Sequence, residues 1–157
     1  MQTGHAVMST FHASSVEKVI QRVTGSPINV PKTYVDNLNV VVIQSQVRFS
    51  VGKVGRRVLS ISEIVGYDPP SDSFTFVEVF RWNSVVDKFE FVGKQSSYLL
   101  EQKIAVKRGF SGTNRQQIYA DVERRAKVLE KLHKEKGIKD FYELLQVLAR
   151  AQQQGVF

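Results

Sequence analysis

The chain contains no cysteine, only four prolines in 157 residues, and no long apolar run. Without cysteine, disulfides and cysteine-based zinc sites are excluded. A transmembrane helix needs about 20 consecutive apolar residues, so the sequence predicts no transmembrane segment. The first residues also lack the basic region and apolar stretch that mark a secretory signal. These absences fit a cytosolic setting.

A nucleotide-binding signature is missing as well. No stretch matches the GxxxxGK(S/T) loop that cradles phosphates in P-loop enzymes. The pair Gly52-Lys53 is followed by neither Ser nor Thr, and we interpret it as a turn between two strands. The sequence therefore predicts that this chain alone does not turn over ATP.

The positive charge is unevenly distributed. The net charge is +7, but residues 1–92 hold nine Lys/Arg against eight Asp/Glu, whereas residues 93–157 hold thirteen against seven. Such an excess is typical of solvated helix faces. It is equally compatible with a docking surface for an acidic protein loop or a membrane-proximal partner.

The N-terminal third has the pattern of α/β structure. We expect a short buried strand at Val7–Phe11, then a helix that Ser14 and Glu17 start with a capping box and that ends before Gly25. The β-branched run Val40–Ile43 predicts a strand covered on both faces.

From residue 56 the pattern changes to alternating strands and then to helices. Strands are expected at 57–65, 73–82 and 88–92, forming an antiparallel meander that includes strand 39–48. The aromatic residues of the middle strand, expected on one face, are Phe74, Phe76, Phe80 and Trp82. Helices are expected at 98–107, after the capping box of Thr113 and Gln116, and after Asp140; the last two are expected to pair as an antiparallel hairpin.

Two of the three histidines flank the first predicted strand. His5 follows Gly4, and His12 follows Thr10-Phe11 in the string Ser-Thr-Phe-His-Ala. This pattern resembles the histidine box of the secretion ATPase superfamily, the hexameric motors of type II and type IV secretion, type IV pili and the archaellum. Later strings follow in the family's order: Ile20-Gln21-Arg22, Pro31-Lys32, Asn39–Val42, Glu63–Pro69 and Phe80–Asn83. The last two are similar to the archaeal branch.

The resemblance implies a function and its residues. His12 would sense the γ-phosphate, His5 would be the other histidine-box residue, and Gly4 and Thr10 would lie at the nucleotide. A histidine suits this task because its ring donates to phosphate oxygens and titrates near neutral pH. The parent motor would use ATP and Mg²⁺, assemble as a hexamer of identical subunits, and push on a polytopic membrane platform protein at the cytoplasmic face of the membrane. No metal site and no nucleic-acid partner are expected.

The resemblance also implies a domain plan. Residues 1–48 would be the tail of a RecA-like P-loop core carrying the histidine box, 49–93 a β-meander packed on that core, and 94–157 a C-terminal helical segment. The phosphate loop and the acidic motifs lie upstream in the family and have no counterpart here. We therefore expect an inactive C-terminal portion whose strands, left partly uncovered, are prone to edge pairing.

Two other interpretations compete. The chain could be a non-enzymatic α+β module that binds nucleic acid or protein through its basic helices, although the phenylalanines of the meander lack the interleaved cations of a base-stacking surface. A stand-alone hydrolase using His5 or His12 as base has no matching nucleophile and acid in the sequence.

Overall fold

The computed structural model describes residues 4–49 and 52–155, which divide into two compact units after Lys103. Each unit is described separately. None of the helices in these ranges is long and apolar enough to cross a lipid bilayer.

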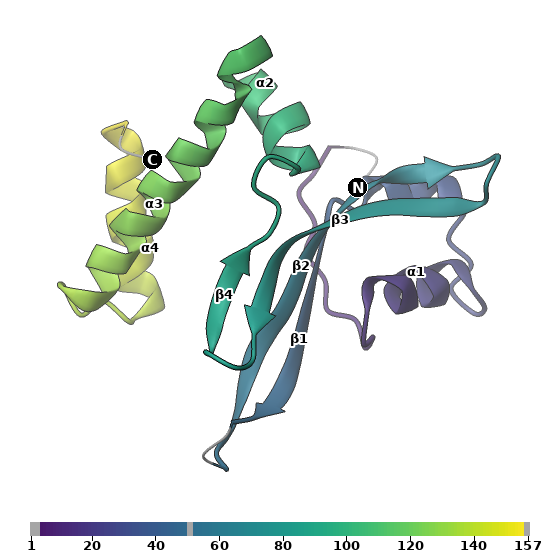
Figure 1. Ribbon diagram of the computed structural model, residues 1–157, viewed down its shortest axis with the longest axis horizontal. Helices are drawn as coiled ribbons and strands as arrows, with labels where there is room; N and C mark the ends of the chain where they lie inside the picture. The colour runs from purple at the N-terminus through teal and green to yellow at the C-terminus, as the bar shows by residue number, and fades with distance from the viewer. Residues whose placement is uncertain (1–3, 50–51, 156–157) are drawn as a thin grey trace. The chain divides into compact units, whose positions relative to one another are not determined.

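The first unit is built on a four-stranded antiparallel sheet with strand order β1-β2-β3-β4 (Figure 1). The strands are β1 (Val40–Arg48), β2 (Val54–Asp68), β3 (Ser73–Asn83) and β4 (Lys88–Phe91). Each strand pairs with the next along the chain, as hairpin connections dictate. The predicted meander, with the 39–48 strand included, is confirmed.

Helix α1 (Val16–Thr24) supplies the apolar core for one face of this sheet. Val16, Val19 and Ile20 recur at helical spacing and are buried against β1 and β2. Ser15, one residue after the predicted Ser14, is the N-cap and accepts a hydrogen bond from the Lys18 amide at 3.3 Å. The predicted helix is thus confirmed, with its cap shifted by one position.

Strand β1 is covered on one face only, so the prediction that both faces are covered is wrong. Val41 and Ile43 are buried in the hydrophobic core between the sheet and α1, whereas Val40 and Val42 are 42% and 52% exposed. The reason is topological: β1 is an edge strand, and among the described residues one helix layer packs against its inner face.

The aromatic residues of β3 lie on two faces, not one. Phe76 pairs with Ile64 and Phe80 pairs with Ile61. Positions three apart on β2 point to opposite faces, because side chains alternate along a strand. A register shift beside Ile61 makes this possible, and Phe80 stacks instead on Phe91 of β4, with ring centroids 4.5 Å apart.

The sequence patterns did not predict a short 3-10 helix, η1 (Lys32–Asn37). It connects the α1–β1 segment to the end of the β2–β3 hairpin. Asp36 Oδ1 accepts a hydrogen bond from the Tyr67 amide at 2.8 Å, and Lys32 forms an ion pair with Asp72 at 2.5 Å. These contacts fix the path of the chain between the helix and the sheet.

The rest of the described chain is helical. It comprises η2 (Leu99–Ile104, π-helical), α2 (Ala105–Lys107), η3 (Gly112–Gln116), α3 (Gln117–Lys134) and α4 (Phe141–Gln153). The predicted capping box of Thr113 and Gln116 is wrong, because a 3-10 turn without a side-chain cap occupies those residues. Asp140 does cap α4, accepting from the amides of Tyr142 and Glu143.

Within the second unit α3 and α4 lie side by side and run in opposite directions (Figure 1). Gly137, at φ +67°, turns the chain between them, and the Ile138 amide donates to the Leu132 carbonyl. The predicted helical hairpin is therefore present.

Candidate functional site

The segment that carries both histidines is extended and exposed. Residues 5–13 belong to no strand in the described structure, and His5 and His12 are both exposed. The prediction of a buried strand at Val7–Phe11 is therefore wrong for this chain. A strand needs a neighbour, and the described sheet ends at β1, whose partner is β2.

The C-terminal end of this segment is nevertheless anchored to α1. The Arg22 guanidinium donates a hydrogen bond to the His12 carbonyl oxygen and lies 5.3 Å from the centre of the Phe11 ring. Ala13 packs against the core cluster. The backbone of His12 is consequently held in place while its imidazole stays in solvent.

The start of α1 adds to this anchor. The Ser15 hydroxyl hydrogen-bonds to Glu17, and that contact, followed by the backbone N–H of Glu17, lowers the pKa of the Glu17 carboxyl. An ionised carboxylate in the first turn is also favoured by the positive end of the helix. The predicted capping box of Ser14 and Glu17 is wrong, because Ser15 is the cap and Glu17, at the second helical position, contacts the Ser15 hydroxyl instead.

The four predicted site residues occupy the same exposed segment. Gly4 has φ +81°, a conformation suited to glycine, and Thr10 is exposed next to Phe11. Their contacts with nucleotide stay predictions, as do those of His5 and His12.

The described part of the β1–β2 connection does not form a phosphate-binding loop around Gly52 and Lys53. Gly52 lies in the β1–β2 hairpin, where its amide donates to the Phe49 carbonyl and the Phe49 amide donates to the Lys53 carbonyl. The pair is thus committed to a turn, as predicted. Within residues 4–49 and 52–155 no group of three or more His, Asp or Glu side chains is placed to hold a metal ion.

A second polar constellation lies in the helical unit. Asp121 of α3 accepts hydrogen bonds from Arg124 at 2.7 Å and Arg125 at 2.9 Å, and forms an ion pair with Arg108. Sequence analysis missed it, although the spacing of Asp121 to Arg124 and Arg125 on a helix is a signal for such pairs. The ion pair of Asp121 with Arg108 has no such signal, because Arg108 lies thirteen residues earlier in the chain and outside α3.

Comparison with known proteins shows that the chain is similar in sequence to parts of longer proteins. It is 45% identical over 148 residues to the uncharacterized protein MJ0900 of Methanocaldococcus jannaschii, 42% over 134 residues to MJ1287, and 31% over 125 residues to MJ0781 of the same organism. The matches cover 94%, 85% and 80% of this chain but 26%, 47% and 16% of those proteins. The chain thus spans less than half the length of each. No protein-family profile matches it.

Proposed function

We propose that the chain is the C-terminal portion of a hexameric motor ATPase of the secretion, type IV pilus and archaellum type. In this proposal the segment from Gly4 to Ala13 completes an ATP site that other parts of the motor build. Residues 1–48 then correspond to the tail of a RecA-like core, and His12 donates a hydrogen bond to the γ-phosphate.

The observation that supports the proposal is that the backbone of His12 is anchored while its side chain is exposed. Its backbone is fixed by Arg22, and its ring is presented to solvent rather than used in the core. Phosphoryl transfer depends on donors that are positioned before the substrate binds, so a fixed backbone with an exposed ring suits the task. The matches to much longer proteins agree with a segment that works inside a larger polypeptide.

The division of labour follows from what the described residues supply. Magnesium and the β- and γ-phosphates need a loop of amides, a lysine and a hydroxyl, and the Gly52-Lys53 turn is not such a loop. His12, Thr10 and Gly4 would contribute donors, while His5, at the other end of the segment, would face the nucleotide or a neighbouring subunit. We place the assembled motor at the cytoplasmic face of the membrane, acting on a polytopic platform protein.

A chimera tests the proposal. MJ0900 is purified with its matching part replaced by this chain, and hydrolysis of ATP in the presence of Mg²⁺ is measured. We expect activity, and we expect His12→Ala to lower kcat by about 10²-fold, the effect of removing one positioned donor to a transition-state oxyanion.

His133→Ala is the matched control, because His133 is the third histidine and lies exposed on α3. It should leave kcat unchanged. The proposal fails if neither MJ0900 nor the chimera binds or hydrolyses ATP, or if His12→Ala and His133→Ala behave alike in a chimera that assembles normally.

A non-enzymatic binding module is the second proposal, favoured by the charge of the helical unit. Residues 104–157 carry eleven Lys/Arg against six Asp/Glu. If the Lys and Arg side chains of residues 104–157 bind nucleic acid, they release counterions from its phosphates. The affinity would therefore fall steeply as the salt concentration rises.

A further inference from the structure

The turn between β3 and β4 presents apolar side chains to solvent. Val85 is 90% exposed and Val86, its neighbour in the chain, is 55% exposed. Phe89, four residues after Val85, is 55% exposed as well. Single exposed apolar residues are common, but several close together at the end of a hairpin form a patch of the kind that marks an interaction site.

Polar side chains hold the backbone of this turn in place. Asn83 Oδ1 accepts hydrogen bonds from the amides of Val85 and Val86, at 3.0 and 3.4 Å. The Asp87 carboxylate accepts two hydrogen bonds from the Arg57 guanidinium of β2, both at 2.7 Å. The turn is thus fixed to a neighbouring strand as well as to its own hairpin. Because valine side chains also have few rotamers, docking of this turn would cost little conformational entropy.

Arg57 also joins the two hairpins that meet at this end of the sheet. Its guanidinium lies 4.6 Å from the centre of the Phe49 ring in the β1–β2 connection, while it binds Asp87 in the β3–β4 turn. The pKa of Asp87 is lowered to about 2, first by the hydrogen bond from Arg57 and then by one from the Trp82 indole. The link between the hairpins therefore stays ionised at any physiological pH.

Exposed cations share this end of the sheet. Residues 48–57 contain four Lys/Arg and no acid. Arg48, Lys53 and Arg56 are exposed, and so is Lys88 at the start of β4. A surface that receives the valines would also meet these cations, which favours carboxylates at its rim.

We propose that the β3–β4 turn is a docking element. Val85 and Val86 insert into an apolar pocket with carboxylates at its rim, on another part of the longer protein in which this segment works. Most of each relative lies outside the matched part, which is 26% of MJ0900 and 16% of MJ0781, and can supply such a pocket. The proposal rests on the segment belonging to a longer polypeptide, as in the proposed function, but not on ATP hydrolysis or on the histidines.

The observations favour a protein pocket over two other anionic partners. A nucleic-acid backbone offers phosphates to the cations but no apolar cavity to the valines. Elements that lie on a membrane insert Trp, Phe or Leu from a broad apolar face. The Asp87 carboxylate, in contrast, lies in this turn, where an anionic lipid surface would repel it.

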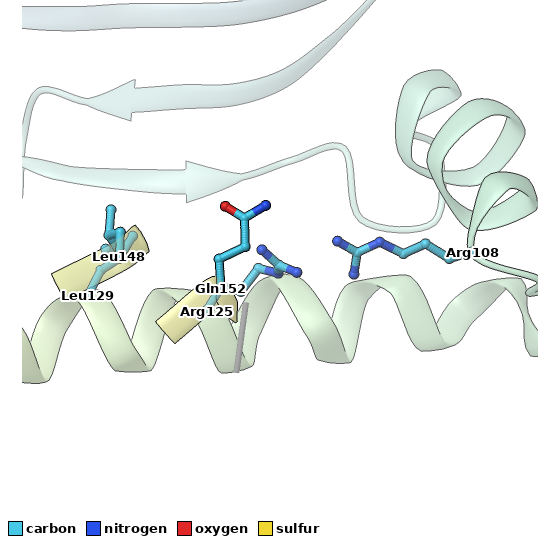
Figure 2. A pocket seen from close by; sticks show the side chains of 5 residues that line it. All are labelled: Arg108, Arg125, Leu129, Leu148 and Gln152. Atoms are coloured by element: carbon cyan, nitrogen blue, oxygen red, sulfur yellow. The ribbon is translucent and has the colours of Figure 1, made fainter. Parts of the chain in front are cut away.

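A hollow within the helical unit of a second copy is also a poorer match. It has a volume of about 330 Å³ and is lined by Arg108, Arg125, Leu129, Leu148 and Gln152 (Figure 2). Its leucines could receive the valines, but none of these five lining residues is acidic.

The test uses the MJ0900 chimera with the photo-reactive residue p-benzoylphenylalanine in place of Ser84, which is exposed next to Val85. Irradiation joins this residue to what it contacts, and mass spectrometry identifies the attached peptide. We expect one dominant peptide from outside the matched part of MJ0900, with apolar residues and at least one Asp or Glu. As the matched control, the same probe replaces Ser71, an exposed serine in the β2–β3 turn at the opposite end of the sheet, and should not give this peptide.

Two variants of the Ser84-labelled chimera test the chemistry of the pocket. Val85→Asp should lower the yield of the peptide by about tenfold or more, because it removes an apolar contact and sets a carboxylate against an acidic rim. Val85→Lys removes the same contact but adds a cation, so it should lower the yield less. Circular dichroism checks that both variants fold.

The proposal is overturned by the absence of a cross-linked peptide, by the same peptide from the Ser71 probe, or by equal yields in the two Val85 variants. Cross-linking of the Ser84 probe to a second copy, to added single-stranded DNA or to phosphatidylcholine–phosphatidylserine vesicles, instead of to the rest of MJ0900, would overturn it as well. A chimera that gives the expected peptide without hydrolysing ATP refutes the proposed function alone. One that hydrolyses ATP without giving the peptide refutes the docking proposal alone.

Discussion

Glu63 and Ser97 are joined by a buried hydrogen bond, with Ser97 Oγ donating to Glu63 Oε1 at 2.7 Å. The other carboxylate oxygen, Oε2, accepts from the Leu99 amide at 3.0 Å, and the Ser97 hydroxyl in turn accepts from the Leu100 amide. Glu63 is 5% exposed and Ser97 1%. A carboxylate in the middle of β2 thus caps the helical segment that starts at Leu99, and these donors offset the cost of burying it.

Replacing this carboxylate should destabilise the sheet unit. Glu63→Gln keeps the shape but replaces one carboxylate oxygen by an NH2 group, which would face either the Ser97 hydroxyl or the Leu99 amide. We expect a loss of about 2 kcal/mol in the free energy of unfolding, the range for hydrogen bonds to charged groups. Urea denaturation followed by Trp82 fluorescence measures it. Glu90→Gln, on the exposed strand β4, should change stability by less than about 0.5 kcal/mol; equal effects would contradict this role of Glu63.

Gly93 is required by a close approach of two backbones. A Cβ at this position would lie 2.6 Å from Val79 Cγ1 and 2.8 Å from Val79 Cα, and the Gly93 amide already donates to the Val79 carbonyl. Gly93→Ala should therefore cost about 1–3 kcal/mol, as overpacking does. Gly66→Ala is the control, because its Cβ would meet nothing closer than 4.0 Å. The expected difference is a lower Tm for Gly93→Ala alone.

The ion-pair cluster of the helical unit should make stability depend on pH. Burial on its own would raise the pKa of Asp121, but hydrogen bonds from Arg124 and Arg125 and the charges of Arg125 and Arg108 outweigh it and lower the pKa to about 2. In the unfolded chain the value is about 3.9. The unfolded state therefore binds more protons between these values, so the stabilisation is complete above about pH 5 and is lost as the pH falls towards 2.

Asp121→Asn should remove this dependence, which is worth about 2 kcal/mol at neutral pH. The measurement is thermal unfolding of helical circular dichroism at a series of acidic pH values. Glu143→Gln, an exposed carboxyl of α4 outside the cluster, serves as the control. An unchanged pH profile in Asp121→Asn would show that the three arginines do not stabilise the unit through this carboxylate.

The outer face of β1 should promote self-association. Val40 and Val42 are exposed on an edge strand, where unpaired backbone groups invite another strand. Val42→Lys should reduce association at high concentration, as measured by light scattering, with little effect on unfolding. Val85→Lys, at a 90% exposed valine between β3 and β4, makes the same chemical change away from the edge and should leave association as it is.

Sequence periodicity predicted where the helices and strands lie better than it predicted which of their faces are buried. The strands of the meander, α1 and the α3–α4 hairpin follow from local alternation and capping signals. The burial of β1 did not, because a continuous β-branched run has the same appearance whether one face or two are covered. The two faces of β3 depend on a register shift beside Ile61, which arises only when β2 and β3 pair.

For the candidate sites, too, the sequence predicted some features and not others. The histidine segment was found from residue order alone, but its anchor was not, since Arg22 reaches the His12 carbonyl from the next helix. The Glu63 cap joins residues 34 positions apart, and no pattern in the neighbourhood of Glu63 indicates it. Contacts of this kind are properties of the folded chain rather than of any local string.

The extended backbone of residues 7–11 pairs with no strand of the described sheet, so it gives the chain an internal reporter of assembly. Its amide protons should exchange with deuterium at nearly the rate of a denatured peptide, while those of β2, flanked by β1 and β3, should be among the slowest. Any polypeptide that lies alongside this stretch and bonds to it will slow that exchange. Mass spectrometry of the N-terminal peptide could then register docking without a substrate, an assay or a label.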